Sequence, residues 1–585
     1  MLKLFKYLKP YTLQLIALII LVVAQVYLTL LLPDYTAKII NSGIIPGDNS
    51  LILHTGLLML GISLIGGICA IGVGFLASRI ATGFSRDLRT AVFSRVESFS
   101  LTEFNKFSTA SLITRTTNDI QQIQLVVIMV LRLFLMAPIT GVWAIIKAYN
   151  NAPSMTWIMG LAVLVLVLMI IVLFAVGLPK FKLLQKMVDR LNLVTRENLT
   201  GLRVIRAFNN EKLEQKRFDN ANEDLTSLNL FVNRLMVILQ PVMMMILNIT
   251  AVAIVWVGAH EIGSGTLQIG NMLAFMQYAM QVIFAFLMFS VIFILVPRAS
   301  VSGQRVAEVI ETKPEICDPE KPIKSKPGRG LVEFKNVTFC YPGADTSVLE
   351  NVSFSAQPGQ TTAIVGSTGA GKSTLIDLIP RFYDANSGEV LVDGVNVKDM
   401  HLEDLYSKVG YVPQKAVLFS GTIKSNIKYG ADDATSAEVK KASQTSQAED
   451  FIKNLNQKYN DPIAQGGTNV SGGQKQRLSI ARAIIKRPEI YIFDDSFSAL
   501  DFKTDSLLRA ALKKETKNKT VIIVAQRIST IMNADKIVVL DDGKIVAQGK
   551  HQDLLKSNLI YREIASSQLT EEELKGRTNA ERTPA

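Results

Sequence analysis

Six apolar runs of roughly twenty residues or more fill the first half of the chain and restrict it to a membrane-spanning fold. They are Tyr11–Leu32, Leu51–Ala77, Leu125–Ile146, Met155–Leu178, Leu235–Val257 and Ile269–Val296. Each run is long enough to cross the hydrocarbon core as a helix. The 585-residue chain is 49% hydrophobic and only 19% charged, which excludes an ordinary soluble enzyme. We therefore predict a transmembrane domain of six helices over residues 1–310.

The positions of Lys and Arg predict the orientation of these helices. Basic residues are abundant between runs two and three and between runs four and five, whereas Pro33–Ser50, Tyr149–Ser154 and Gly258–Leu267 hold almost none. Cytoplasmic segments carry the excess of Lys and Arg, so both termini are expected in the cytoplasm of a cell membrane protein. Much of the net charge of +12 then lies against anionic headgroups. This favours membrane lipid over nucleic acid as a partner.

The two basic connections are too long for simple loops and keep helical periodicity. They are expected to extend the spanning helices far into the cytosol. Each pattern breaks once, around Ser100–Ser108 and around Gly201–Asn209, which predicts a short helix at each tip. Such tips could contact a cytosolic domain, and ordinary turns are the alternative.

Polar side chains within the apolar runs cost free energy in the hydrocarbon core, so each is a candidate for the lining of a substrate cavity. The candidates are Arg132, Asn248, Gln277 and Gln281, with Gln25 as a further polar position. The alternative is structural, because an arginine can snorkel to the interface and amides can bond neighbouring helices.

A soluble α/β domain is predicted over residues 331–565, after a Lys-, Pro- and Gly-rich linker at 311–330 and before a polar, disordered tail at 566–585. Its strand Thr361–Val365 leads into a complete phosphate loop, followed by an apolar helix. Backbone N–H groups of such a loop close around phosphates, the lysine bridges the β and γ oxygens, and the following serine binds Mg²⁺. ATP and Mg²⁺ are therefore the predicted ligands. The loop residues are Gly366, Ser367, Thr368, Gly369, Ala370, Gly371, Lys372, Ser373 and Thr374.

Two further patterns complete a nucleotide-binding domain. The strand Ile490–Phe493 ends in Asp494, a carboxylate placed to complete the magnesium shell. A Gly-Gly turn opens a helix at Ser471, Gly472, Gly473 and Gln474. Exposed N–H groups at a helix start suit a phosphate, yet the chain already has a phosphate loop. The second anion site therefore predicts a partner that brings its own nucleotide.

The chain resembles the ATP-binding cassette (ABC) family, with Ser471–Gln474 similar to its signature motif and six spans fused to a C-terminal cassette as in exporter half-transporters. The resemblance implies a dimer with two ATP molecules, each held between one phosphate loop and the other subunit's signature. By matched position, Tyr341 would stack on adenine, Gln414 would join Ser373 and Asp494 around Mg²⁺, and Asp501 would belong to the D-loop.

Two positions depart from the family pattern. Asp495 stands where the family has the glutamate that activates water, and Gln526 stands where it has the switch histidine. A shorter carboxylate misplaces the base, and glutamine cannot carry the proton or charge of histidine. The pattern predicts a degenerate site that binds ATP but hydrolyses it poorly, although a slow working site is also compatible.

These features predict one half of a heterodimeric exporter of amphipathic, multidrug-type compounds. Its partner would be a different half-transporter that supplies the consensus glutamate and histidine. Three alternatives stay open: a homodimeric lipid flippase, an importer, and an ATP-gated channel or its regulator. The spans offer no obvious ring of charge for ions, which argues against the channel.

Overall fold

The computed structural model describes residues 2–323 and 329–569. The chain divides into two compact units. The helical unit contains residues 1–97 and 109–312, and the α/β unit contains residues 98–108 and 313–585. Part of the expected linker and the tail from residue 570 onward lie outside the described residues.

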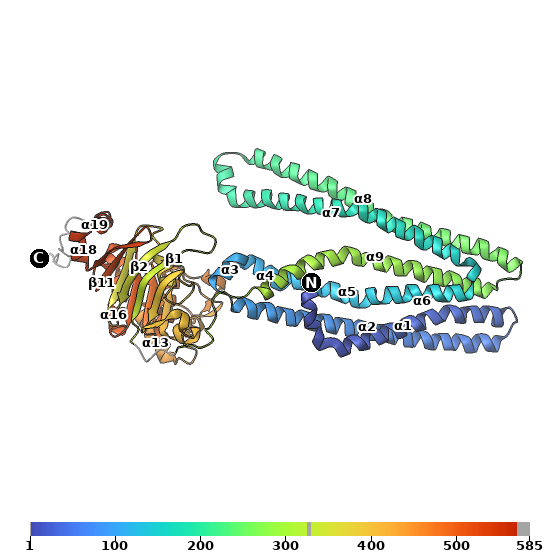
Figure 1. The fold of residues 1–585 in the computed structure, drawn as a ribbon, viewed down its shortest axis with the longest axis horizontal. Coiled ribbons are helices and arrows are strands. Elements are labelled where there is room, and N and C mark those ends of the chain that lie inside the picture. Colours follow the sequence, from blue (N-terminus) through green and yellow to red (C-terminus); the bar gives the residue numbers. More distant parts are fainter. Residues whose placement is uncertain (1, 324–328, 570–585) are drawn as a thin grey trace. The chain divides into compact units, whose positions relative to one another are not determined.

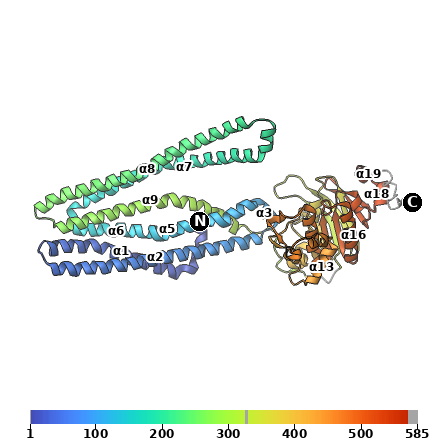
Figure 2. The same ribbon diagram turned by 180° about the vertical axis from the view of Figure 1, so that it is seen from behind.

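The helical unit contains long helices joined by short turns and interrupted by π-helical segments (Figures 1 and 2). Its described part contains six helices long and apolar enough to cross a membrane. The elements are η1 (Leu2–Tyr11), α1 (Thr12–Lys38), η2 (Ile39–Ile44), α2 (Asn49–Glu97), α4 (Thr109–Thr114), η3 (Arg115–Asp119), α5 (Ile120–Met129), η4 (Val130–Phe134), α6 (Leu135–Asn151), η5 (Pro153–Met155), α7 (Thr156–Ala207), α8 (Glu211–Gly263) and α9 (Ile269–Glu311).

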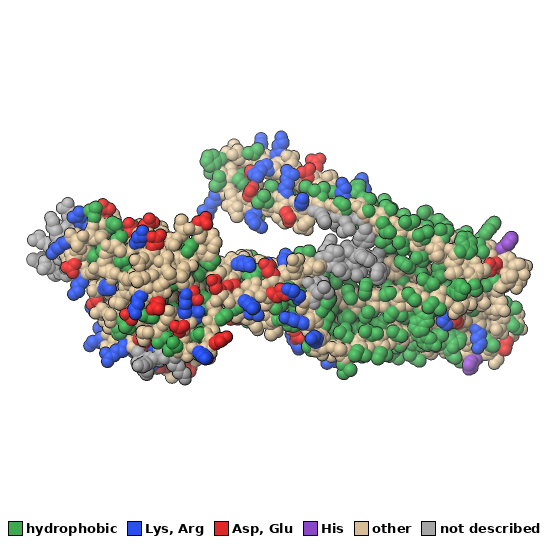
Figure 3. All heavy atoms as spheres, in the orientation of Figure 1, with side chains coloured by type: hydrophobic (Ala, Val, Ile, Leu, Met, Phe, Trp, Pro, Cys, Tyr) green, Lys and Arg blue, Asp and Glu red, His purple; other side chains and the backbone are tan. Residues whose placement is uncertain are grey.

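These helices expose apolar side chains over much of their length, because their solvent is lipid. Leu13 is 80% exposed and Ile71 is 74% exposed. Hydrophobic side chains cover one end of the helical unit, and Lys and Arg gather at the opposite end of α7 and α8 (Figure 3). A helix satisfies its own backbone hydrogen bonds, so such a surface is compatible with a bilayer.

The ends of the long helices differ in part from the helix breaks and turns predicted from the sequence. The first tip holds a short helix, α3 (Leu101–Phe107), which confirms that prediction. The prediction was wrong at the second tip, because α7 continues to Ala207 and α8 begins at Glu211. A single glycine costs a helix only about 1 kcal/mol, so Gly201 does not end α7. The expected connection at Pro33–Ser50 is also largely helical, since α1 continues through Pro33 into the π-helical η2.

The α/β unit is built on a central sheet of six strands in the order β12-β11-β3-β10-β9-β6, with β12 antiparallel to β11. A second sheet has the antiparallel order β2-β1-β4-β5. The strands are β1 (Val332–Phe339), β2 (Leu349–Ala356), β3 (Thr361–Gly366), β4 (Ser387–Val392), β5 (Val395–Asn396), β6 (Val409–Val412), β7 (Gly421–Thr422), β8 (Pro462–Ile463), β9 (Ile490–Asp494), β10 (Thr520–Val524), β11 (Lys536–Asp541) and β12 (Lys544–Gly549).

The helices of this unit are α3, α10 (Lys372–Asp377), α11 (Leu402–Lys408), α12 (Ile423–Lys428), α13 (Ser436–Thr445), α14 (Glu449–Lys453), α15 (Gly472–Ile485), α16 (Phe502–Glu515), α17 (Ile528–Ile531), α18 (His551–Ser557) and α19 (Leu559–Ser566). Two hydrophobic clusters cover the two faces of the central sheet. In β9, Ile490 and Ile492 belong to one cluster while Tyr491 and Phe493 belong to the other. Strands buried on both faces need no polar alternation, which explains the uniformly apolar patterns.

Helix α3 belongs to the α/β unit although its sequence lies between spans. A capping box between Ser100 and Glu103 begins the helix. Glu103 Oε1 also accepts from the N–H of Glu315 at 3.1 Å, and Asn105 Nδ2 donates to Tyr383 Oη at 3.4 Å. The helix therefore bonds to the segment before β1 and to the residues after α10.

Candidate functional site

The phosphate loop connects β3 to α10 at the carboxyl edge of the central sheet. Gly369 and Gly371 have φ angles of 88° and 91°, in the left-handed region that favours glycine. A Cβ atom on Gly371 would lie 3.0 Å from the carbonyl oxygen of Val348. These glycines let the loop turn its N–H groups inward, as a phosphate cradle requires.

Lys372 lies inside this loop and bonds to its own backbone. Its Nζ donates to the carbonyl oxygens of Gly366 at 2.9 Å and Ser367 at 2.6 Å. Burial lowers the pKa of the ammonium group, and the carboxylates of Asp495 and Asp494 oppose that shift. The lysine is thus held at the loop with two acceptors that phosphate oxygens could replace.

Ser373 and Asp494 converge from α10 and β9. The Ser373 hydroxyl donates to Asp494 Oδ1 at 3.1 Å, and Asp494 is only 5% exposed. Burial raises the pKa of the Asp494 carboxyl, and the Ser373 hydrogen bond lowers it. A hydroxyl and a carboxylate beside a phosphate loop are oxygen donors of the kind Mg²⁺ prefers. These two residues therefore fit a magnesium ion.

Tyr341 stands at the end of β1 inside an aromatic group that the sequence did not predict. Its ring is perpendicular to that of Tyr383, with centroids 5.2 Å apart, and lies 4.9 Å from that of Phe339. Its hydroxyl is 2.9 Å from Thr374 Oγ1 in the phosphate loop. An aromatic ring fixed beside the loop is suited to stack on a base.

Asp495 and Gln414 are brought together from β9 and from the segment after β6. Gln414 Nε2 lies 3.5 Å from Asp495 Oδ2. Asp495 has φ 42°, and its N–H donates to the carbonyl of Val524 at 2.9 Å. Left-handed backbone is uncommon outside glycine and gathers at functional sites. The short carboxylate is 9% exposed at the sheet edge.

Gln526 follows β10 and is exposed. In the sheet, Val524 pairs with Asp494 on one side and Ile364 on the other. Residue 526 therefore leaves the sheet at the edge that carries the phosphate loop and Asp494. Asp501 begins α16, where its Oδ1 accepts from the N–H of Thr504 at 2.9 Å. That backbone hydrogen bond lowers the pKa of the Asp501 carboxyl.

The signature segment begins α15 with a reciprocal cap. Ser471 Oγ accepts from the N–H of Gln474, and Gln474 Oε1 accepts from the N–H of Ser471 at 2.9 Å. A Cβ atom on Gly473 would lie 3.1 Å from the carbonyl oxygen of Ala499, so the backbone there passes close to the D-loop. Within the described residues, no hydrogen bond joins this turn to the phosphate loop.

The four candidate cavity residues come from three helical segments of the helical unit. Arg132 is in the π-helical η4, Asn248 is on α8, and Gln277 and Gln281 are on α9. Arg132 and Asn248 are exposed, whereas the Oε1 atom of Gln281 is buried with no hydrogen-bond partner. In the part of the chain that the structure describes, no hydrogen bond connects any two of them.

A charged cluster that the sequence analysis did not predict joins α1, α6 and α9. Asp34 accepts from Lys147 Nζ at 2.6 Å, from Tyr278 Oη at 2.5 Å and from Asn151 Nδ2 at 3.1 Å. The Tyr278 side chain is fully buried. Asp34 and Lys147 fall just outside the apolar runs, so a search within the runs missed both.

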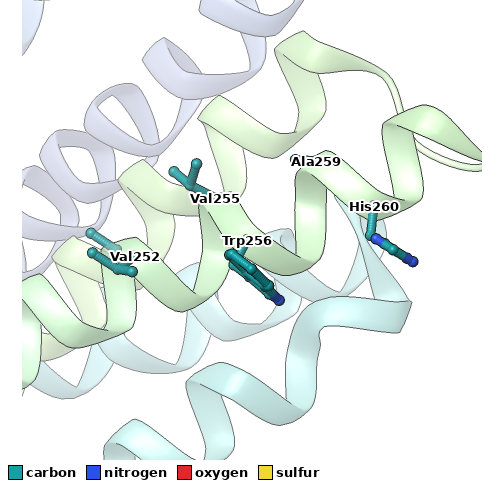
Figure 4. A pocket seen from close by; sticks show the side chains of 6 residues that line it. Val252, Val255, Trp256, Ala259 and His260 are labelled. Carbon is teal, nitrogen blue, oxygen red and sulfur yellow. The ribbon is translucent and has the colours of Figure 1, made fainter.

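A shallow apolar groove runs along α8. Val252, Val255 and Trp256 lie along it, with His260 at its end (Figure 4). Trp256 is 79% exposed. Tryptophan is enriched where a helix reaches the membrane interface, so this surface is compatible with contact to lipid.

Comparison with known proteins decides the family. The ABC transporter transmembrane region matches residues 15–286, and the ABC transporter domain matches residues 349–498. An uncharacterized ABC transporter ATP-binding protein of Mycobacterium tuberculosis is 40% identical over 567 residues, 96% of this chain and 97% of that protein. The chain is an ABC transporter.

Further relatives place this ABC transporter among exporters. The ATP-dependent lipid A-core flippase of Syntrophus aciditrophicus is 31% identical over 88% of this chain and 85% of that protein. The structure of a bacterial Atm1-family ABC exporter with ATP bound aligns with TM-score 0.80 and 26% identity, covering 96% of this chain and 99% of the other. The transporter is thus an ATPase-coupled, multi-pass membrane protein of the half-transporter type, with six spanning helices fused to an α/β cassette.

Proposed function

We propose that this ABC transporter exports amphipathic, multidrug-type compounds as one half of a heterodimer. In this proposal the chain binds Mg·ATP at a site that hydrolyses it poorly, and its partner holds the hydrolytic site. Both termini face the cytoplasm, in agreement with the basic end of α7 and α8 (Figure 3). The observation that carries the proposal is the pair Asp495 and Gln526 within an otherwise complete nucleotide site.

The binding elements of this site are present and mutually placed. Lys372 would bind the β and γ oxygens, Tyr341 would stack on adenine, and Ser373, Asp494 and Gln414 would hold Mg²⁺. The ligands of this site would be ATP, whose phosphates carry negative charge, and the Mg²⁺ ion that neutralises part of that charge. Nothing in this set predicts weak nucleotide binding.

The hydrolytic elements are the altered ones. A carboxylate one methylene shorter than glutamate ends about 1.5 Å farther from its target. General-base assistance contributes about 10²- to 10⁴-fold, so a misplaced base loses much of it. Gln526 cannot supply the protonated form that a histidine offers. Both changes reduce cleavage and leave binding intact.

The intact signature segment predicts a role for this chain in the ATP site of its partner. The cap uses the N–H groups of Ser471 and Gln474, which leaves the N–H groups of Gly472 and Gly473 at the start of α15 to bind an anion. Among the described residues, no hydrogen bond joins these four residues to the chain's own phosphate loop. They would therefore complete the ATP site of the partner, a second half-transporter with glutamate and histidine at the two altered positions. Asp501 would contribute at the same interface through the D-loop.

The substrate would enter a cavity lined by Arg132, Asn248, Gln277 and Gln281. These side chains supply the sparse polar contacts within apolar helices, which suits amphipathic molecules of varied shape. Amphipathic substrates also agree with the flippase relative, whose name states that it acts on a lipid.

Nucleotide trapping on the assembled transporter tests this function. Each chain would be labelled with a photoreactive ATP and vanadate, and the nucleotide on each chain would be identified. Intact ATP on this chain and trapped ADP on the partner are expected. Brisk Mg-ATP turnover by this chain purified alone would contradict the proposal and favour a homodimeric flippase, whose activity lipid should stimulate.

A further inference from the structure

A side chain from the end of the described chain holds the backbone of the segment after β10. Gln568 Nε2 donates to the carbonyl oxygen of Gln526 at 2.9 Å. The N–H of Ile528 donates to Gln568 Oε1 at 2.8 Å. One carboxamide therefore bridges the peptide groups on both sides of Arg527. We call this pair of hydrogen bonds the Gln568 bracket.

The helix that precedes Gln568 is well packed in the α/β unit. Gln568 follows α19, where Tyr561 and Ala565 are fully buried. The Tyr561 hydroxyl lies 2.7 Å from His551 Nδ1, which fixes α19 to α18. Leu569, the next residue, packs against the same hydrophobic cluster. Because α19 is anchored through Tyr561 and Ala565 and Leu569 is partly buried, the exposed Gln568 side chain extends from a fixed stretch of backbone.

Other contacts hold different parts of the segment. Arg527 Nη2 donates to the carbonyl of Ser498 at 3.3 Å, and Arg509 Nη1 donates to the carbonyl of Ser529 at 3.1 Å. These bonds fix the side chain of Arg527 and the start of α17. Within residues 2–323 and 329–569, the hydrogen bond to the Gln526 carbonyl comes from Gln568. Gln568 therefore holds the peptide group between residues 526 and 527, whose orientation helps to set the direction of the Gln526 side chain.

We propose that Gln568 is a positioning residue that sets where residue 526 points at the nucleotide site. The inference rests on the proposed function, in which residue 526 takes the place of the histidine at the nucleotide site. The direction of a side chain follows from the two peptide planes beside its Cα atom. Releasing one plane displaces the end of the side chain, and a displacement of about 1 Å can cost about 10²-fold in rate.

The first test measures hydrogen exchange in the full chain assembled with its partner. Gln568→Ala removes both bonds, and Gln568→Glu keeps the acceptor for Ile528 while losing the donor to Gln526. Losing one such bond should speed exchange in residues 526–531 about threefold to tenfold, as expected for the glutamate variant. The alanine variant loses both bonds and should exchange about tenfold to 10²-fold faster. Unchanged exchange would overturn the proposal.

Gln548→Ala is the matched control. Gln548 Nε2 donates to the carbonyl of Ser353 at 2.9 Å, so this variant also removes a bond between an exposed glutamine and the backbone in the α/β unit. It lies on β12, and it should leave exchange in residues 526–531 and all nucleotide measurements unchanged. A matching effect of this variant would show a general loosening of the unit and would also overturn the proposal.

The second test separates positioning from a structural role. In a chain carrying Asp495→Glu and Gln526→His, adding Gln568→Ala should lower kcat for ATP about tenfold and leave KM within about twofold, because Tyr341 and the phosphate loop are untouched. Faster exchange with unchanged kcat would overturn the positioning role. If the double variant itself gains no hydrolysis, the proposed function fails separately. A spin label at Gln526→Cys, in a chain whose three native cysteines are replaced, then decides. Gln568→Ala should increase the mobility of this label, and an unchanged spectrum overturns the proposal.

Discussion

The carboxamide nitrogen of Gln414 lies 3.5 Å from the carboxylate oxygen Oδ2 of Asp495, at the outer limit of a hydrogen bond. The two side chains reach this position from β9 and from the segment after β6. A glutamate at residue 495 would carry its carboxylate one methylene farther from the backbone than Asp495 does. Substitution of residue 495 therefore tests directly whether the short carboxylate is the reason for poor ATP hydrolysis at this site.

Restoring both altered residues should increase cleavage. Asp495→Glu together with Gln526→His should raise ATP turnover at this site about 10²-fold, and each change alone should give less, because the base and its partner act together. Single-turnover hydrolysis of ATP bound to this chain measures the gain. Asp495→Asn, which preserves size but removes the base, is the control and should not exceed the native rate.

Lys372 should control nucleotide affinity. Lys372→Ala removes charge-assisted bonds to phosphate worth about 1.5–3 kcal/mol, so the Kd for ATP should rise about 10- to 10²-fold. Equilibrium binding of a fluorescent ATP analogue to this chain measures the loss. Lys475→Ala is the comparison, since Lys475 Nζ bonds only to the carbonyl of Gly466 among the described residues and should leave affinity within about twofold.

The Asp34 cluster should stabilise the helical unit. Asp34→Asn leaves Lys147 without its carboxylate and should destabilise the protein by about 1–3 kcal/mol, since both groups are only partly exposed. Thermal unfolding in nanodiscs measures the change. Combining Asp34→Asn with Lys147→Met should cost less than the two single changes added together, and strict additivity would show that the ion pair contributes nothing.

The raised pKa of the Asp377 carboxyl predicts that the stability of the folded protein depends on pH. Burial raises the pKa of its carboxyl to about 6 from 3.8, while its hydrogen bond from Tyr411 Oη opposes the shift. Between these two values the folded state binds more protons than the unfolded state, so the stability contributed by protonated Asp377 is lost as pH rises through about 6 and the loss then levels off. Asp377→Asn should therefore stabilise the nucleotide-free protein at pH 8 by up to about 3 kcal/mol and have little effect near pH 4. Equal effects at both pH values would contradict the shift.

Much of the fold follows from patterns within short segments. Apolar runs specified the six spans, and the phosphate loop could be located because glycines, lysine and serine must stand at fixed spacing. The strands Thr361–Val365 and Ile490–Phe493 were recognisable because both faces of the sheet are buried. The short helix after Ser100 was foreseen from a break in periodicity alone.

Features that depend on contacts between distant segments could not be found in this way. Gly201 looked like a helix end, yet α7 passes through it because the neighbouring residues favour a helix. Asp34, Lys147 and Tyr278 are unremarkable separately and become a cluster only when α1, α6 and α9 pack together. Gln568 lay within a segment expected to be disordered, although residues up to 569 are ordered enough to hold residue 526.

The assignment of α3 to the α/β unit changes how that unit is tethered. The chain passes between the two units at three places, after Glu97, before Thr109 and after Thr312. A protease that cuts between Glu315 and β1 would leave the cassette attached only through noncovalent contacts with Ser98–Ser108, among them the hydrogen bond between Asn105 and Tyr383. A cassette released with α3 still bound would need further cuts on both sides of that helix.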